Sequence, residues 1–298
     1  MCVTGLPPCL DPTDNFSLNA HPMTQHVFDK ALALVSSDLR PGLFSGTTSQ
    51  DYWNMVGPFG GTTAAVMLGA VMQHPELLGA PIAQTVNFAS AIGAGAFEVQ
   101  ATPVRTNRST QHWTIALTQP GPDGTPQVMT TGTVVTAARR ETWSLADMTM
   151  PDVPRPADVP RLDLGASAVA WFGHYEMRPL KGKLPAQWDD ATHHSESMLW
   201  MRDATPRVLD FPALASMSDM FYPRVWLRRA KRVPVGTVSM TTYFHANAAQ
   251  LAEVGTGYLL GRAVGQQFSN GFFDQAAQLW SEAGALLATS NQIVYFKE

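Results

Sequence analysis

The chain shows one pattern twice: a helix-like segment followed by a run of strand-like segments rich in Val, Thr, Ile and aromatic residues. Hydrophobic periodicity predicts the first helix over residues 60–73 and the second over residues 211–227. Turns rich in Gly and Pro separate the strand-like segments, as expected between antiparallel strands. The predicted strands are residues 42–49, 82–90, 96–107, 110–119 and 127–137, then 197–203, 237–246, 258–269, 272–282 and 286–296. A helix with its antiparallel sheet, repeated once, predicts the α+β class with two modules in tandem.

Changes in composition divide the chain into four segments. They are a tail predicted to be disordered (1–22), a first module (23–145), a proline-dense linker (146–165) and a second module (166–298). The tail lacks the basic start and the long apolar core of a secretory signal. Met23 opens a further helix-like segment, so translation could start at Met1 or at Met23.

The composition is typical of a well-packed globular protein: of 298 residues, 45% are hydrophobic and 15% are charged. The net charge of -4 argues against a general nucleic-acid binder, which would carry a basic excess. The longest apolar runs are too short to span a bilayer, so no membrane partner is expected. Cys2 and Cys9 are the only cysteines, which excludes a disulfide framework and favours a reducing, cytoplasmic location.

The stretch VGPFGGTTAAVMLGAV, residues 56–71, combines glycines and threonines at the start of an apolar helix. A phosphate loop would need a lysine directly after the last glycine, but Thr62 follows Gly61. The glycines are also not spaced G-x-G-x-x-G, as a dinucleotide site requires. The stretch therefore begins a helix and does not hold a nucleotide.

The order and spacing of these segments resemble the double-hotdog acyl-CoA thioesterases, in particular the bacterial acyl-CoA thioesterase II group. The resemblance rests on FGGTTAAVMLGAV and TVNFASAIGAGAFEV in the first half, and on ALASMSDMF, TVSMTTYFHA and GALLATSNQ in the second. It extends over residues 47–296, nearly the whole chain. It implies two hotdog modules, each with an antiparallel sheet wrapped around a central helix, and a hydrolase that splits acyl-CoA into fatty acid and CoA.

The resemblance also implies three catalytic residues: Asp219 in SMSDMF, Thr237 in TVSMTTYF and Gln292 in ATSNQIV. A carboxylate can take a proton from water, while Thr and Gln hold the same water in place. An Asp with an ordinary pKa of about 4 would be ionised at neutral pH.

The local sequence patterns leave these roles open. Asp219 falls in mid-helix, where Asp is unfavourable and usually faces solvent. Strand alternation turns Thr237 away from the helix unless the strand carries a bulge there, so Thr241 and Thr242 are alternatives. Gln292 is equally compatible with a polar position on a half-exposed strand.

Substrate contacts are predicted at the glycines and at a basic cluster. Gly60 and Gly61 have two interpretations. They allow the backbones of helix and sheet to pack closely, or they begin a helix whose free N–H groups stabilise a thioester oxyanion. Arg228 and Arg229 are candidates for the CoA phosphates, although basic residues at a helix end are also favoured by its dipole. The other basic candidates are Arg224, Lys231 and Arg232 in the same cluster, and the weaker pair Arg105 and Arg108.

Hydrolysis of acyl-CoA by an oriented water is the leading hypothesis, with no metal and no cofactor expected. The chain contains neither G-x-S-x-G nor H-E-x-x-H, the signatures of a serine hydrolase and of a zinc protease. One alternative is a protein that binds acyl-CoA or another apolar ligand without turnover. Another is a hydratase or dehydratase, although these typically pair a His with an acid and Asp219 has no His nearby in sequence. A homodimer is expected by resemblance, since exposed sheet edges invite pairing.

Overall fold

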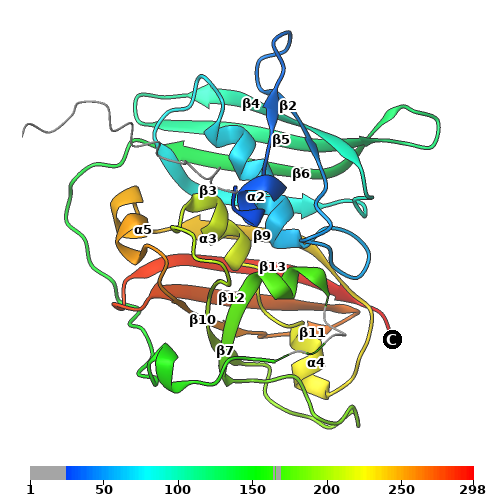
Figure 1. The fold of residues 1–298 in the computed structure, drawn as a ribbon, viewed down its shortest axis with the longest axis vertical. Coiled ribbons are helices and arrows are strands. Elements are labelled where there is room, and N and C mark those ends of the chain that lie inside the picture. The colour runs from blue at the N-terminus through cyan, green and yellow to red at the C-terminus, as the bar shows by residue number, and fades with distance from the viewer. Residues whose placement is uncertain (1–24, 164, 166–168) are drawn as a thin grey trace, which may run out of the picture.

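The computed structural model describes residues 25–163, 165 and 169–298, which form an antiparallel sheet of 13 strands with short helices (Figure 1). The predicted tail, both candidate start methionines and both cysteines lie outside the described residues. The first half consists of α1 (Val27–Ala31), β1 (Val35–Ser36), β2 (Leu43–Thr47), α2 (Gly60–Met72), β3 (Ala80–Phe88), β4 (Ala96–Thr106), β5 (Thr110–Pro120) and β6 (Pro126–Ala137).

The second half repeats this plan with additional short elements. It consists of β7 (Tyr175–Lys181), β8 (Ser197–Asp203), α3 (Phe211–Met217), α4 (Arg224–Arg229), β9 (Val235–Phe244), α5 (Ala248–Val254), β10 (Leu259–Val264), β11 (Phe268–Ser269), β12 (Phe272–Ser281) and β13 (Leu286–Phe296). Within the described residues, 3-10 turns at Pro156–Asp158 and Ala170–His174 precede β7. The predicted strands match these bounds closely, except that the one predicted over residues 258–269 is divided into β10 and β11. Strands β1 and β7 and helix α5 are not among the predictions.

The two halves of the sheet have the same strand order. It is β1-β2-β4-β5-β6-β3 in the first half and, counted from the opposite edge, β7-β8-β10-β12-β13-β9 in the second. The halves join through the antiparallel pair β3–β9, where the hydroxyl oxygens of Thr85 and Thr241 lie 2.9 Å apart. This repetition confirms the α+β class and the two modules in tandem.

Helix α2 forms the centre of the first module, and its bounds confirm the predicted helix. Its residues from Gly61 to Val71 are all buried, as expected for a helix that is apolar on every side. Figure 1 shows α2 and α3 next to each other, and the two helices pack together. A Cβ at Gly61 would lie 2.4 Å from the carbonyl oxygen of Ser216, so only Gly permits this approach.

The prediction of one continuous helix over residues 211–227 is wrong, because α3 ends at Met217 and α4 begins only at Arg224. Pro223 explains the interruption, since a proline cannot donate the helical hydrogen bond and restricts the residue before it. The hydroxyl of Ser218 also donates to the carbonyl oxygen of Leu214 at 2.8 Å, a bond that slightly destabilises and bends helices.

The segment of residues 150–162, here called the strap, covers part of the face of the second module's sheet that lies opposite the helices. Alternate residues of the strands face this side, including Trp200 of β8 and Trp280 of β12, and they pack against Val159 of the strap. The indole N–H of Trp200 donates to the carbonyl oxygen of Pro154 at 2.9 Å. The strap therefore covers this face around β8 and β12, whereas Tyr243 of β9 and Ile293 of β13 are 47% and 44% exposed.

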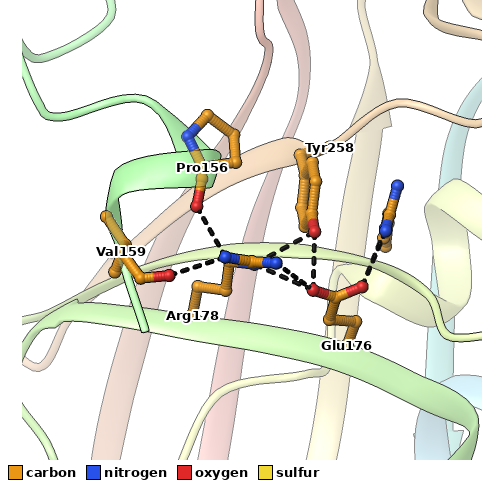
Figure 2. A network of polar contacts seen from close by, with 6 residues as sticks. Pro156, Val159, Glu176, Arg178 and Tyr258 are labelled. Atoms are coloured by element: carbon orange, nitrogen blue, oxygen red, sulfur yellow. Dashed lines mark hydrogen bonds and ion pairs between the residues drawn. The ribbon is translucent and has the colours of Figure 1, made fainter. Parts of the chain in front are cut away.

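A polar network holds the strap in place (Figure 2). Arg178 Nη1 donates to the carbonyl oxygens of Pro156 and Val159, at 2.9 and 2.8 Å. The carboxylate of Glu176 accepts from Arg178 at 2.8 Å and from the hydroxyl of Tyr258 at 2.6 Å. This carboxylate thereby fixes the arginine that holds the strap.

Glu176 also binds Arg202, whose Nη2 lies 2.8 Å from the second carboxylate oxygen. Burial alone would raise the pKa of Glu176, but the donors Tyr258, Arg202 and Arg178 outweigh it and lower the pKa to about 2. Because this value lies below the ordinary one of 4.5, the carboxylate stabilises the fold above pH 4.5. That stabilisation is lost as the pH falls towards 2.

We expect Glu176→Gln to lower the free energy of unfolding at pH 7 by about 2–4 kcal/mol, because two arginines lose their counter-charge. Urea unfolding at pH 7 and at pH 3 measures the effect, which should shrink at the lower pH. Glu98→Gln is the control, since its pair with Arg40 is exposed and spans 3.7 Å. The control should lose less than about 1 kcal/mol. Equal losses in the two variants would contradict a structural role for the network.

Candidate active site

Asp219 lies in the turn after α3, where its carboxylate meets strand β13. Gln292 Nε2 donates to Asp219 Oδ1 at 2.8 Å, and Thr237 Oγ1 donates to Gln292 Oε1 at 3.4 Å. The three residues come from a helix end and two neighbouring strands, and they form one chain of hydrogen bonds. The structure thus brings together all three residues implied by the resemblance.

A β-bulge explains how Thr237 reaches this face of the sheet. Ser239 pairs with Ile293 and Thr237 pairs with Val294, so Val238 has no partner in the register. One extra residue turns the preceding side chain to the opposite face. Thr237 therefore points to the side of Gln292, where strict alternation would have turned it away.

The alternative threonines are placed differently. The hydroxyl of Thr241 bonds to Thr85 of the first module across the junction of the two halves. Thr242 is 1% exposed and pairs in register with Ser290. In the described part of the chain, the side-chain hydrogen bonds of Asp219 and Gln292 include Thr237 but neither of these residues.

The first turn of α2 faces Asp219 from the other module. A Cβ at Gly60 would lie 2.7 Å from Asp219 Oδ2, so the carboxylate contacts the start of this helix directly. The first N–H groups of a helix have no partner within it, and the N-cap residue Phe59 has no polar side-chain atom to cap them. The site therefore combines a carboxylate from the second module with a helix N-terminus from the first.

Burial between the two helices raises the pKa of Asp219 to about 7. Hydrogen bonds from Gln292 and from the backbone N–H of Gly61 act in the opposite direction and are weaker in effect. The expectation of an ordinary pKa near 4 is therefore wrong. A carboxylate that titrates near neutral pH is well suited to accept a proton from water.

Arginines of the basic cluster, residues 224–232, form hydrogen bonds and ion pairs within the protein. Arg224 is 0% exposed and donates to carbonyl oxygens, including those of Tyr222 and Ser195. The expectation that Arg224 contacts CoA phosphates is therefore wrong. A buried arginine satisfied by backbone oxygens carries no sequence signal that separates it from an exposed one.

Arg228 and Arg229 lie nearer the surface. Arg228 Nη1 donates to the carbonyl oxygen of His193 at 2.6 Å, and Arg229 pairs with Asp190 at 2.9 Å and with Glu298. Both guanidinium groups thus have partners in the second module. Their contact with CoA phosphates stays a prediction.

A small cavity lies beside the first turns of α2. It has a volume of about 20 Å³, and Pro58, Thr62, Val66, Phe97 and Leu117 are among the residues that line it. This volume corresponds to about one water molecule. Its mostly apolar lining places hydrophobic surface within one turn of Gly60 and Gly61.

Within residues 25–163, 165 and 169–298, no three His, Cys, Asp or Glu side chains gather as ligands for a metal ion. None of the helices in this part of the chain combines the length and the apolar character that crossing a bilayer requires.

Comparison with known proteins identifies both halves. Residues 49–137 match the acyl-CoA thioesterase N-terminal domain, and residues 147–296 match the acyl-CoA thioesterase C-terminal domain. No curated protein matches the chain.

Solved structures give the same fold. A conserved protein of unknown function with a hot dog fold from Alicyclobacillus acidocaldarius is 47% identical, with a TM-score of 0.84 over 92% of this chain and 98% of that one. An acyl-CoA thioesterase II from Mycobacterium marinum is 18% identical, with a TM-score of 0.71 over 91% of this chain and 98% of that one. The predicted hotdog modules are thereby confirmed, and the chain belongs to the acyl-CoA thioesterase family with two hotdog domains in tandem.

Proposed function

We propose that the protein hydrolyses acyl-CoA thioesters to free fatty acid and CoA, with Asp219 as the general base. The observation that carries the proposal is the hydrogen-bonded chain from Asp219 through Gln292 to Thr237, placed directly at the N-terminus of α2. It joins the two elements that thioester hydrolysis needs, a proton acceptor and donors for an oxyanion. Membership of the acyl-CoA thioesterase family supports the choice of substrate.

In the proposed reaction, a water bound at Asp219 attacks the thioester carbonyl carbon as its proton passes to the carboxylate. Gln292 and Thr237 hold the carboxylate and the water in line with the carbonyl. The negative charge that develops on the carbonyl oxygen is stabilised by the N–H groups at the start of α2 and by the helix dipole. The tetrahedral intermediate then expels the thiolate of CoA, which takes up the proton from Asp219.

The apolar lining of the cavity beside α2 offers a place for the end of the acyl group. Because the cavity accommodates about one water-sized group, a long chain would require its walls to move apart. Arg228 and Arg229 are proposed as contacts for the CoA phosphates, which would compete with their present partners.

The test is a panel of acyl-CoA substrates of increasing chain length, with release of free thiol as the measurement. We expect turnover of at least part of the panel. Tight binding of a non-hydrolysable acyl-CoA analogue without turnover of any substrate would instead support the non-catalytic binding protein. Addition of water to an enoyl-CoA, seen as loss of its double-bond absorbance, would support the hydratase.

A further inference from the structure

The turn that carries Asp219 is held at two points by buried hydroxyl groups. Ser290 Oγ of β13 donates to the carbonyl oxygen of Ser218 at 3.2 Å. On the other side, the hydroxyl oxygens of Ser216 and Tyr175 lie 2.9 Å apart, which ties the turn to β7. The backbone N–H of Asp219 itself donates to the carbonyl oxygen of Ser216 at 3.2 Å. Two residues that precede Asp219, Ser216 and Ser218, are thus anchored to the sheet.

These contacts lie in the interior, where a hydroxyl bond has a well-defined direction. Ser216 and Ser218 are 0% exposed, Ser290 is 1% exposed and Tyr175 is 2% exposed. Where an α-helix stops, its last carbonyl groups need other partners. Ser290 supplies one to Ser218, directly before Asp219.

Ser290 and Gln292 act on consecutive residues of the turn. They lie two positions apart on β13, so their side chains point to the same face of the sheet. Ser290 holds the carbonyl of Ser218, and Gln292 holds the carboxylate of Asp219. One strand therefore fixes both the backbone and the side chain of the proposed base.

The first module provides an internal comparison. The two modules meet at the pair Thr85–Thr241. The residue after Thr85 is Val86, which pairs with Gly132 of β6. The residue after Thr241 is Thr242, which pairs with Ser290 of β13. Gly132 is therefore the counterpart of Ser290.

By the same register, Val134 is the counterpart of Gln292, since it pairs with Gln84 where Gln292 pairs with Met240. Helix α2 runs unbroken opposite Gly132 and Val134, whereas α3 stops opposite Ser290 and Gln292. The serine and the glutamine thus occur together with the helix break that places Asp219.

We propose that Ser290, together with Tyr175, is a positioning residue that holds the 216–219 turn so that the carboxylate of Asp219 stays between Gln292 and the start of α2. This role rests on the proposed hydrolysis. Loss of the anchor lets the turn relax, which weakens the bond from Gln292 and misaligns the base.

We expect Ser290→Ala to lower kcat about 10-fold with KM unchanged, because displacement of a catalytic group by a fraction of 1 Å is enough for such a loss. Tyr175→Phe should act in the same direction, and the double variant should lose less than the product of the two effects. Ser290→Thr keeps the hydroxyl and should restore most of the activity.

The pKa of Asp219 provides a readout that needs no substrate. The groups of the described chain that influence it are Gln292 and the N–H of Gly61, with no charged side chain among them. A weaker bond from Gln292 should move the pKa of Asp219 upwards in Ser290→Ala. Carbon NMR titration of protein labelled at Asp, assigned with Asp219→Asn, measures this shift.

Ser195→Ala is the matched control, since Ser195 is also buried and its Oγ donates to a backbone carbonyl oxygen, that of Gly265 at 3.0 Å. It should lower the melting temperature about as much as Ser290→Ala does, and it should leave kcat and the pKa of Asp219 unchanged. Absence of thioesterase activity in the wild type would refute only the proposed function. The NMR titration would still test whether Ser290 positions Asp219. An unchanged pKa of Asp219 in Ser290→Ala, or an equal loss of kcat in Ser195→Ala, would overturn the positioning role.

Discussion

Asp219→Asn is expected to lower kcat for acyl-CoA hydrolysis by about 10²–10⁴-fold, the usual contribution of one general base. The amide keeps the shape of the side chain but cannot take a proton from water. Binding of a non-hydrolysable acyl-CoA analogue should change little, because the carboxylate acts mainly in the transition state. Thiol release and calorimetric binding measure the two effects separately.

Gln292→Ala is the graded comparison for this experiment, and its loss of kcat should be smaller because Gln292 orients the base without taking the proton. Equal turnover by the wild type and Asp219→Asn would remove Asp219 from the mechanism.

The same pair of proteins tests the pKa of Asp219. Because the ionised carboxylate is the proposed base and its pKa is raised to about 7, wild-type kcat/KM should rise with pH around a midpoint near 7. An ordinary Asp would place that midpoint near 4. Asp219→Asn should lack this dependence in its residual activity.

Stability gives an independent check on this pKa. The folded protein holds the Asp219 proton up to about pH 7, whereas the unfolded chain releases it near the ordinary value of 3.8. Stability should therefore fall as the pH rises between these values, and the ionised carboxylate destabilises the fold above pH 7. Asp219→Asn should consequently melt at a higher temperature than the wild type at pH 8, with little difference at pH 4.

The repeated fold could be predicted from the sequence because its elements carry strong local patterns. Helix α2 is a continuous apolar segment of helical length, and β13 is rich in β-branched and aromatic residues. The sequence pattern does not predict the break after Met217, because the apolar pattern continues across it and only Pro223 marks the interruption. For the strap the sequence predicts only a linker, since proline-rich segments have no periodicity that shows which surface they cover.

The geometry of the candidate site could not be predicted from the sequence alone, because it depends on contacts between segments that are far apart in the chain. A bulge at Val238 determines which way Thr237 points, and no local pattern predicts a single unpaired residue. Burial between helices from two modules sets the pKa of Asp219, so neither half of the sequence contains the cause alone. The family motifs indicate Asp219 and Gln292 as site residues, but only the fold shows that their side chains form a hydrogen bond.

Gly60→Ala is expected to lower kcat about 10²-fold, as for a catalytic group displaced by about 1 Å. The added Cβ would lie 2.7 Å from Asp219 Oδ2 and 3.4 Å from the ring of Phe88, so the carboxylate must move. Its new position would weaken the bond from Gln292 and turn the base away from its water. Steady-state kinetics with one acyl-CoA substrate measures this loss.

Gly69→Ala in the same helix separates this displacement from a general effect of replacing Gly. A Cβ at Gly69 would meet only Gln73 Nε2, at 3.8 Å, and the position lies in the helix interior. Ala is favoured over Gly in a helix by about 0.5–1 kcal/mol, so this variant should be more stable and keep the wild-type kcat. If Gly60→Ala also kept the wild-type kcat, the carboxylate would have room to retreat without loss of function. Catalysis would then not depend on contact between Asp219 and the start of α2.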